Sequence, residues 1–322
     1  MSAKPSVLVT RRLPVLVESA LRSRFGVVQD PEDRPLTERE LRDGLRAHDA
    51  LLCTVTDPLI ARCFAGGGVR ARIVANFGVG VNHIALDAAR AAGVTVTNTP
   101  DVLTDDTADL AILLMLSVLR RSGEGERELR DGRWTGWRPT HLLGRRMTGR
   151  TLGIVGYGRI GQAVARRARA AFGMPVVVWT RTPSSAAADA GVRFAGSLDE
   201  LLPAVDVLSL HCPATVETRH LIGAAQLARM RPDAILVNTA RGDIVDELAL
   251  VDALRERRIA GAGLDVYEQE PVVHPGLLAR EDVVLLPHLG SATVETREAM
   301  GMRALANLEA FFAGAAPPDR VA

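Results

Sequence analysis

The sequence TLGIVGYGRIG lies in the middle of the chain, after about 150 other residues. A short apolar strand, Leu152 to Val155, leads into Gly156, Gly158 and Gly161, and a helix-like apolar pattern runs from Ile160 to Phe172. This order is the context of a dinucleotide-binding turn. The first glycine makes the turn, the second admits a pyrophosphate, and the third lets helix and strand pack closely. We therefore predict a dinucleotide-binding domain with the phosphates at a helix N-terminus.

The composition excludes several classes of protein. Hydrophobic residues make up 47% and charged residues 24%, as in ordinary globular domains, and the net charge of +1 favours neither a nucleic-acid nor a membrane partner. The longest apolar run, Leu110 to Leu119, has about half the length that spans a bilayer. Lys4 is the sole lysine, which excludes Schiff-base catalysis and a P-loop lysine further along the chain.

Cysteine usage bears on the compartment and on metals. Cys53, Cys63 and Cys212 form an odd, scattered set without CxxC spacing, so we expect neither a disulfide framework nor a metal site. Residues 1–14 lack the apolar core of a signal peptide. We therefore predict a cytoplasmic protein.

Short apolar strands alternate with helical patterns on both sides of the glycine motif. Before it, the predicted strands are 6–9, 50–54, 73–76 and 95–97, and the predicted helices are 14–25, 38–47 and 84–92. After it, the predicted strands are 176–179, 207–210, 235–238, 261–265 and 283–286, and the predicted helices are 197–202, 224–230 and 246–257. Because this alternation is typical of parallel α/β sheets, we predict two doubly wound parallel-sheet domains.

Three further segments connect or complete these domains. A helix is predicted from about Thr104 to Arg120, acidic at its start and basic at its end, as the helix dipole favours. Residues 122–149 have the composition of a loop-like arm that carries Trp134 and Trp137. Large aromatic residues there indicate burial against another subunit, with local packing on the same domain as the alternative. A helix over 293–312 could return to the first domain.

Three polar residues follow the last three predicted strands. Arg241 lies within NTARG, Glu270 within LDVYEQEP and His288 within PHLGSAT. Ligands bind at the carboxyl ends of parallel strands. A guanidinium suits a substrate carboxylate or a polarised carbonyl, and a carboxylate beside an imidazole stabilises its protonated form. Each residue alone could be a surface ion pair, a solvated charge or a turn residue, but together they predict a general acid, its support and a substrate-binding cation.

Seven segments in order resemble the D-isomer-specific 2-hydroxyacid dehydrogenases over essentially the whole chain. They are NFGVGVNHI (76–84), NTPDVLTDDTADLAILLML (98–116), GRTLGIVGYGRIGQAVA (149–165), HCPATVETRHLI (211–222), NTARGDIVDE (238–247), GAGLDVYEQEP (261–271) and LPHLGSAT (286–293). Within that family, WTGWRPTHLLGRRMTGRTLGIVG (134–156) is most similar to glyoxylate/hydroxypyruvate reductases. The expected domains are a flavodoxin-like substrate domain, 1–98 plus 289–322, and a Rossmann dinucleotide-binding domain, 99–288, with 122–149 as a dimerisation arm.

The resemblance also implies residue roles. His288 would donate a proton, Glu270 would support its imidazole, and Arg241 would bind the substrate. Substrate contacts are also implied at the N–H groups of Val79 and Gly80, which form a nest-like anion site, and at Ser291. The implied reaction transfers a hydride from a nicotinamide cofactor to a small 2-ketoacid, in a homodimer formed through the arm and helix 104–120.

The predicted cofactor contacts are gathered at the glycine motif and the neighbouring strand ends. The residues themselves indicate Gly156, Gly158, Gly161, Thr180, Arg181 and Thr182. The resemblance implies further contacts at Arg159, Ile160, Cys212, Pro213, Thr239 and Ala240, with Thr107 and Asp265 as added candidates, the last as a partner of the nicotinamide carboxamide. Cys212 could instead be only a small buried residue.

The strand after the glycine helix ends VVVWTRTP, and this ending bears on the choice of cofactor. Thr180 to Thr182 stand where an NAD-binding fold usually has an acid, and the next acid is Asp189. We therefore expect that no carboxylate repels a 2′-phosphate and that Arg181 could bind one. We predict NADP(H), with NAD(H) as the alternative if Arg181 stacks on adenine.

These observations together predict a glyoxylate/hydroxypyruvate reductase. Within the enzyme class, another 2-ketoacid reductase or a short phosphoglycerate dehydrogenase stays open. The alternative from a different class is a non-catalytic NAD(P)-sensing protein resembling a transcriptional corepressor. Such a protein should lack the Arg241, Glu270 and His288 set or carry long interaction tails, and neither feature is seen.

Overall fold

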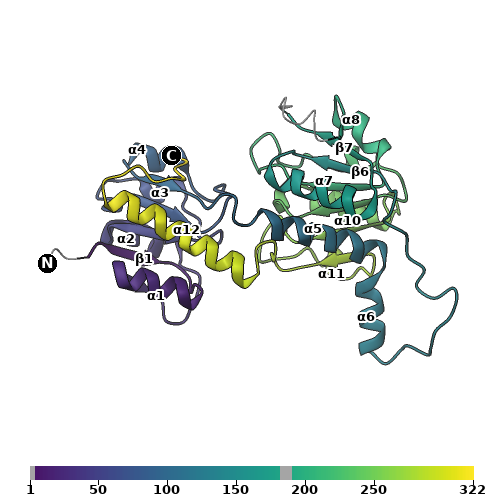
Figure 1. Ribbon diagram of the computed structural model, residues 1–322, viewed down its shortest axis with the longest axis horizontal. Helices are drawn as coiled ribbons and strands as arrows, with labels where there is room; N and C mark the ends of the chain where they lie inside the picture. Colours follow the sequence, from purple (N-terminus) through teal and green to yellow (C-terminus); the bar gives the residue numbers. More distant parts are fainter. Residues whose placement is uncertain (1–3, 182–190) are drawn as a thin grey trace. The chain divides into compact units, whose positions relative to one another are not determined.

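The computed structural model describes residues 4–181 and 191–322, and the chain divides into two compact units (Figure 1). Unit 1 is Met1–Leu103 with Ser291–Ala322, and unit 2 is Thr104–Gly290. Each is built on a parallel sheet with helices on its faces, which confirms the predicted α/β class with two parallel-sheet domains.

The sheet of unit 1 has five parallel strands in the order β2-β1-β3-β4-β5. They are β1 (Ser6–Val9), β2 (Gly26–Gln29), β3 (Ala50–Cys53), β4 (Ile73–Asn76) and β5 (Thr95–Thr97). The helices are α1 (Val15–Arg24), α2 (Glu38–Ala47), α3 (Ala61–Phe64), α4 (Leu86–Ala91) and α12 (Val294–Phe312). The sequence did not predict β2, because this edge strand is only half buried and lacks the continuous apolar run of the central strands.

The C-terminal helix α12 completes the core of unit 1. Its buried residues include Met300, Ala304 and Leu308. Gly301 lets it approach α1, since a Cβ at this position would lie 2.5 Å from the side chain of Val17. The opposite face of the sheet packs against α2, α3 and α4 around Leu51 and other buried strand residues.

The sheet of unit 2 has seven parallel strands in the order β12-β11-β10-β9-β6-β7-β8. They are β6 (Leu152–Val155), β7 (Val176–Trp179), β8 (Arg193–Phe194), β9 (Val207–Leu210), β10 (Ile235–Asn238), β11 (Gly261–Leu264) and β12 (Val283–Leu285). The helices are α5 (Thr104–Leu119), α6 (Ser122–Arg130), α7 (Arg159–Phe172), α8 (Leu198–Leu201), α9 (Ala224–Leu227), α10 (Glu247–Arg255) and α11 (Pro275–Leu278), with 3₁₀ turns at Leu202–Ala204 and Gly242–Ile244.

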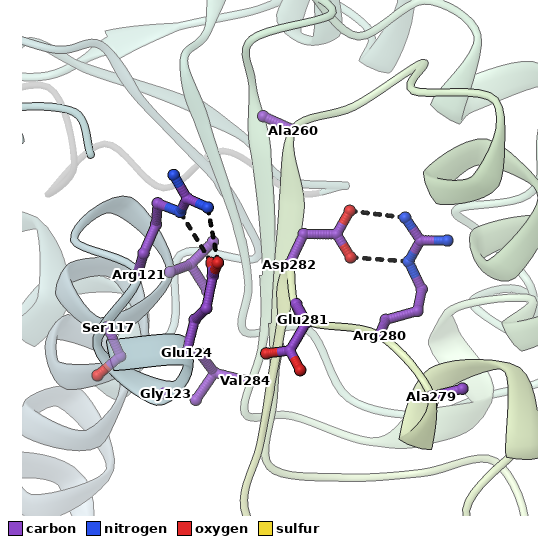
Figure 2. A pocket seen from close by; sticks show the side chains of 11 residues that line it. Ser117, Arg121, Gly123, Glu124, Ala260, Ala279, Arg280, Glu281, Asp282 and Val284 are labelled. Carbon is purple, nitrogen blue, oxygen red and sulfur yellow. Dashed lines mark hydrogen bonds and ion pairs between the residues drawn. The ribbon is translucent and has the colours of Figure 1, made fainter. Parts of the chain in front are cut away.

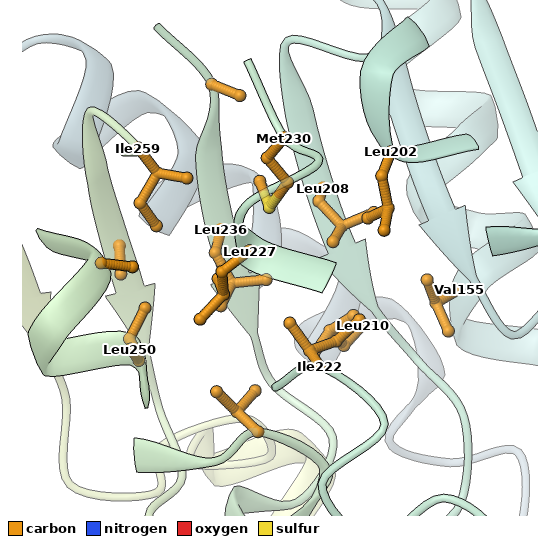
Figure 3. Close-up of a cluster of buried hydrophobic side chains, with 14 of the residues drawn as sticks. Val155, Leu202, Leu208, Leu210, Ile222, Leu227, Met230, Leu236, Leu250 and Ile259 are labelled. Atoms are coloured by element: carbon orange, nitrogen blue, oxygen red, sulfur yellow. The ribbon is translucent and has the colours of Figure 1, made fainter. Parts of the chain in front are cut away.

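Both faces of this sheet are buried, and alternate residues of a strand pack into the hydrophobic core on one face or the other. Ile235 and Val237 of β10 pack with residues of α5 and α7, whereas Leu236 packs on the other face with Leu227 and Leu250 (Figure 3). Burying each such side chain contributes roughly 2 kcal/mol by removing apolar surface from water. The order of strands reverses between β6 and β9, and the carboxyl ends at such a switch point are where an open α/β sheet binds ligands.

The predicted arm is helical in its first part, which corrects the expectation of a loop over 122–149. α6 covers Ser122–Arg130, and residues 131–149 form no helix or strand. The arm extends away from the sheet of its own unit (Figure 1). Trp137 is 84% exposed, so the alternative of local packing on the same domain is wrong for this residue, whereas Trp134, 51% exposed, is partly covered.

Candidate active site

The glycine motif forms a tight turn at the switch point between β6 and β9. A Cβ on Gly156, where φ is +91°, would lie 2.6 Å from the backbone nitrogen of Cys212, and a Cβ on Gly161 would lie 2.4 Å from the carbonyl oxygen of Gly156. A Cβ on Gly158 would meet nothing within 4 Å, and no side chain caps α7 at this residue. The turn therefore leaves open space at a helix N-terminus, where an anion is favoured.

Other predicted cofactor residues line the same edge, and their chemistry fits a dinucleotide. The hydroxyl oxygen of Thr239 is buried without a hydrogen-bond partner among the described residues, as expected for a group that meets a ligand. Burial raises the pKa of the Cys212 thiol to about 11 and lowers the pKa of His211 to about 4, so both groups are neutral at pH 7. Pro213 is exposed and Ala240 half-buried at this edge.

His288 and Glu270 form a hydrogen-bonded pair at the carboxyl edge of the sheet. His288 Nδ1 lies 2.8 Å from Glu270 Oε2, and the two side chains are 30% and 34% exposed. Burial alone would raise the pKa of Glu270, but the His288 contact, the Tyr267 N–H and the charge of Arg241 together lower it. Glu270 is therefore ionised and holds Nδ1, which leaves Nε2 as the atom for proton transfer.

His288 has a backbone φ of +56°, which non-glycine residues rarely adopt. The turn is held because the carboxylate of Asp265 accepts the N–H groups of Leu289 at 2.6 Å and Gly290 at 2.8 Å. The hydroxyl of Thr107 donates to the carbonyl of Gly290 at 2.9 Å. Asp265 and Thr107, which the sequence predicted as cofactor contacts, thus have a partner in the turn that carries His288, and their contact with a cofactor stays a prediction.

Arg241 follows β10 in a turn that Asn238 stabilises. The Asn238 amide donates to the carbonyl of Arg241 at 2.8 Å, and its oxygen accepts the N–H of Ala240 at 3.0 Å. Burial lowers the pKa of the Arg241 guanidinium, while Glu270 and Asp243 raise it, and the group stays charged. Because the Arg241 charge acts on Glu270, the structure brings the three predicted catalytic residues together.

The sequence did not predict the contact that joins the Arg241 and Glu270 turns. A Cβ on Gly242 would lie 1.8 Å from the carbonyl carbon of Tyr267, so the two backbones touch here. The N–H of Tyr267 donates to Glu270 Oε1 at 3.1 Å, and its hydroxyl donates to the carbonyl of Leu286 at 2.8 Å. The glycine in NTARG was the available signal, but its partner is 25 residues away in the sequence.

The remaining predicted substrate residues lie in unit 1. The Asn76 amide donates to the carbonyls of Gly78 and Gly80, at 2.9 and 3.0 Å, and the Asn98 amide donates to that of Val79 at 2.9 Å. Among the residues the structure describes, the N–H groups of Val79 and Gly80 donate to no protein acceptor. Ser291 is half-buried at the start of the returning segment.

Residues 180–182, on which the predicted choice of cofactor depends, include a contact that the sequence did not predict. Thr180 and Arg181 follow β7, whereas Thr182 lies outside the described residues. Arg181 is 75% exposed, and its Nη1 atom lies 4.0 Å from the carboxylate of Glu217. A carboxylate therefore does lie near Arg181, but it comes from the loop after β9 and not from the strand before Arg181.

A surface hollow of about 500 Å³ lies at the opposite, amino edge of unit 2 (Figure 2). It is bordered by the end of α5, the start of α6 and the residues before β11 and β12. Its walls carry the ion pairs of Arg121 with Glu124 and of Arg280 with Asp282. None of the predicted site residues lines it.

The described residues contain no group of three or more His, Cys, Asp and Glu side chains placed to hold a metal ion. All three cysteines are buried and unpaired with one another. In the same part of the chain, no helix combines the length and apolarity that crossing a membrane requires.

The chain is similar to several known proteins over nearly its full length. A family model for the NAD-binding domain of D-isomer specific 2-hydroxyacid dehydrogenases matches residues 112–290. A glyoxylate reductase of Thermococcus onnurineus is 44% identical over 99% of this chain and 96% of its own. The crystal structure of a D-isomer specific 2-hydroxyacid dehydrogenase-like protein from Polaromonas superposes with a TM-score of 0.92 at 36% identity, covering 99% of this chain and 100% of its own. An NADPH-dependent glyoxylate/hydroxypyruvate reductase of Sinorhizobium meliloti, solved with NADP and malonate, gives 0.86 at 37% identity, covering 99% and 97%.

Proposed function

Because this chain belongs to the D-isomer specific 2-hydroxyacid dehydrogenase family, we propose that it reduces glyoxylate and hydroxypyruvate, using a nicotinamide dinucleotide. The observation that carries the proposal is the pair of His288 and Glu270, 2.8 Å apart, with the charge of Arg241 beside it. The names of the relatives support the choice of substrate. A non-catalytic sensing protein would have no need for this assembled set.

The residues of the site have distinct roles in this reaction. When bound, the dinucleotide supplies the hydride that the 2-keto carbon accepts. Arg241 binds the substrate and, with the His288 imidazolium, stabilises the negative charge that develops on the keto oxygen. His288 then donates its Nε2 proton to that oxygen, while Glu270 keeps Nδ1 in place and balances the positive charge.

The substrate carboxylate is proposed to bind the N–H groups of Val79 and Gly80 and the hydroxyl of Ser291. Asn76 holds the carbonyl of Gly80 and Asn98 holds that of Val79, which supports the proposal that the N–H groups of this turn are a preformed anion site. A two-carbon or three-carbon 2-ketoacid supplies the single carboxylate that such a site accepts.

The dinucleotide would be held by residues of unit 2. Gly156, Gly158 and Gly161 with the first residues of α7, Arg159 and Ile160, suit the pyrophosphate, and Thr239 offers an unpaired hydroxyl. We favour NADP(H) over NAD(H), because the residues after β7 are the usual place of the acid that binds the ribose 2′-hydroxyl, and Arg181 there can bind a phosphate instead. The preference is tested by comparing kcat/KM for NADPH and NADH in the wild type and in Arg181→Ala.

The activity is tested with purified protein and either glyoxylate or hydroxypyruvate. NADPH absorbance at 340 nm should fall in the wild type, and His288→Ala should abolish turnover while its dissociation constant for NADP⁺, measured calorimetrically, stays near the wild-type value. If neither NADPH nor NADH is oxidised with any 2-ketoacid, the enzyme proposal is wrong.

A homodimer through the arm 122–149 and α5 is part of the proposal. Trp134, Trp137 and Leu143 of the arm and Leu113 of α5 are between 50% and 84% exposed, so covering them removes apolar surface from water. Sedimentation should show a dimer for the wild type and a raised dissociation constant of the dimer for Trp137→Asp. The cytoplasmic location stays a prediction from the sequence.

A further inference from the structure

We propose that Glu217 limits the preference of this protein for NADP(H) and offers NAD(H) the carboxylate that the strand before Arg181 lacks. The inference rests on the proposed function, since it takes Arg181 as the site of the 2′-phosphate. It adds a residue that acts against that phosphate. Glu217 and Arg181 are 36 positions apart in the sequence, and the fold brings their charges within 4.0 Å.

The position of Glu217 is defined by its own loop. The hydroxyl of Thr215 donates to Glu217 Oε2 at 2.6 Å. The hydroxyl of Thr218 accepts the N–H of Thr215 at 2.8 Å and donates to the carbonyl of Pro213 at 2.7 Å. The far end of the loop is tied to the sheet edge, because His220 Nε2 lies 2.7 Å from Glu268. These bonds hold the Glu217 carboxylate on the side where Arg181 stands.

Glu217 is ionised at neutral pH. The hydroxyl of Thr215 is the main cause that lowers its pKa, and the charge of Arg181 lowers it further. Its side chain is 68% exposed and that of Arg181 is 75% exposed, so both groups can contact a ligand from solvent.

The two charges act in opposite directions on the two cofactors. A 2′-phosphate at Arg181 gains the guanidinium but meets the negative charge of Glu217, which already forms an ion pair with that guanidinium. A ribose 2′-hydroxyl carries no charge and can donate a hydrogen bond to the carboxylate, as it does to the acid of NAD-binding folds. The pair therefore makes the site tolerant of both dinucleotides, and Glu217 sets how far NADP(H) is favoured.

The experiment measures dissociation constants of NADP⁺ and NAD⁺ by calorimetry for the wild type and Glu217→Gln. The amide keeps the shape of the side chain and removes its charge. We expect the dissociation constant of NADP⁺ to fall roughly three- to tenfold, the range for one exposed charge near a phosphate, and that of NAD⁺ to stay equal or rise. The gain should shrink at about 1 M salt, where exposed charges are screened.

Glu256→Gln is the matched control, because Glu256 is an exposed carboxylate paired with Arg258 at the amino edge of the same sheet. It removes the same charge and should change neither constant. If Glu217→Gln leaves the ratio of the two constants unchanged, or improves both cofactors equally, the inference is overturned. Binding is read without turnover, so a protein that shows this shift but reduces no 2-ketoacid refutes the proposed function and leaves the role of Glu217 standing.

Discussion

The contact between Gly242 and Tyr267 predicts a large effect for Gly242→Ala. The added Cβ would lie 1.8 Å from the carbonyl carbon of Tyr267, 2.0 Å from its oxygen and 2.4 Å from the nitrogen of Glu268. Since carbon atoms pack at about 3.5 Å, the two backbones must separate by about 1.7 Å. Overpacking of this kind costs about 3 kcal/mol of the free energy of unfolding. A displacement beyond 1 Å between Arg241 and Glu270 should also lower kcat/KM by about 100-fold.

The assay combines denaturant unfolding with steady-state kinetics on the same preparations. Gly223→Ala is the control, because its Cβ would meet its first neighbour, the carbonyl oxygen of His220, at 3.6 Å. It should change the free energy of unfolding by less than about 1 kcal/mol and leave kcat/KM near the wild-type value. If Gly242→Ala matches this control in both measurements, the reasoning from the backbone contact is wrong.

Three other substitutions test single groups. Glu270→Gln should lower kcat about 100-fold or more while NADP⁺ still binds in calorimetry, because the amide cannot balance the charge on His288. Burial raises the pKa of Asp57 above its unfolded value, so its ionisation destabilises the folded state as the pH rises. Asp57→Asn should therefore become more stable relative to the wild type as the pH rises above about 4, measured by thermal unfolding. Burial lowers the pKa of His211 to about 4, so the folded state resists its protonation and the wild type should lose stability as the pH falls from about 6.5 to 4. The loss should be at most about 3 kcal/mol of the free energy of unfolding. His211→Gln should flatten this pH dependence, measured by urea unfolding at each pH.

The central strands could be predicted because both faces of each sheet are covered by helices. Strands such as 73–76 and 235–238 are therefore continuous apolar runs, and the structure confirms them with the same bounds. The edge strands β2 and β8 are partly exposed, so they lack that pattern and were not predicted. The sequence does not indicate α6 as a helix, because its residues, SGEGERELR, are mostly polar and include two glycines.

The site shows the same division between local and distant signals. Arg241, Glu270 and His288 could be found because each follows its own strand, and parallel strands bring their carboxyl ends to one edge. Glu217 could not, because it approaches Arg181 from a different loop and nothing near either residue in the sequence indicates the pair. The hydrogen bonds from the Leu289 and Gly290 N–H groups to Asp265 could not be predicted either, because the partners are more than 20 residues apart in the sequence.

Backbone contacts, more than side-chain packing, place the three residues that we propose to be catalytic. Asp265 fixes the strained turn of His288 through two N–H groups, and Asn238 fixes the turn of Arg241 through a carbonyl and an N–H. A left-handed conformation at a non-glycine residue costs about 1 to 3 kcal/mol and persists only where surrounding bonds hold it. A site held in this way should tolerate changes in apolar side chains behind the sheet better than the loss of a single amide or carboxylate at its edge, because only the latter releases a turn that carries a reacting group.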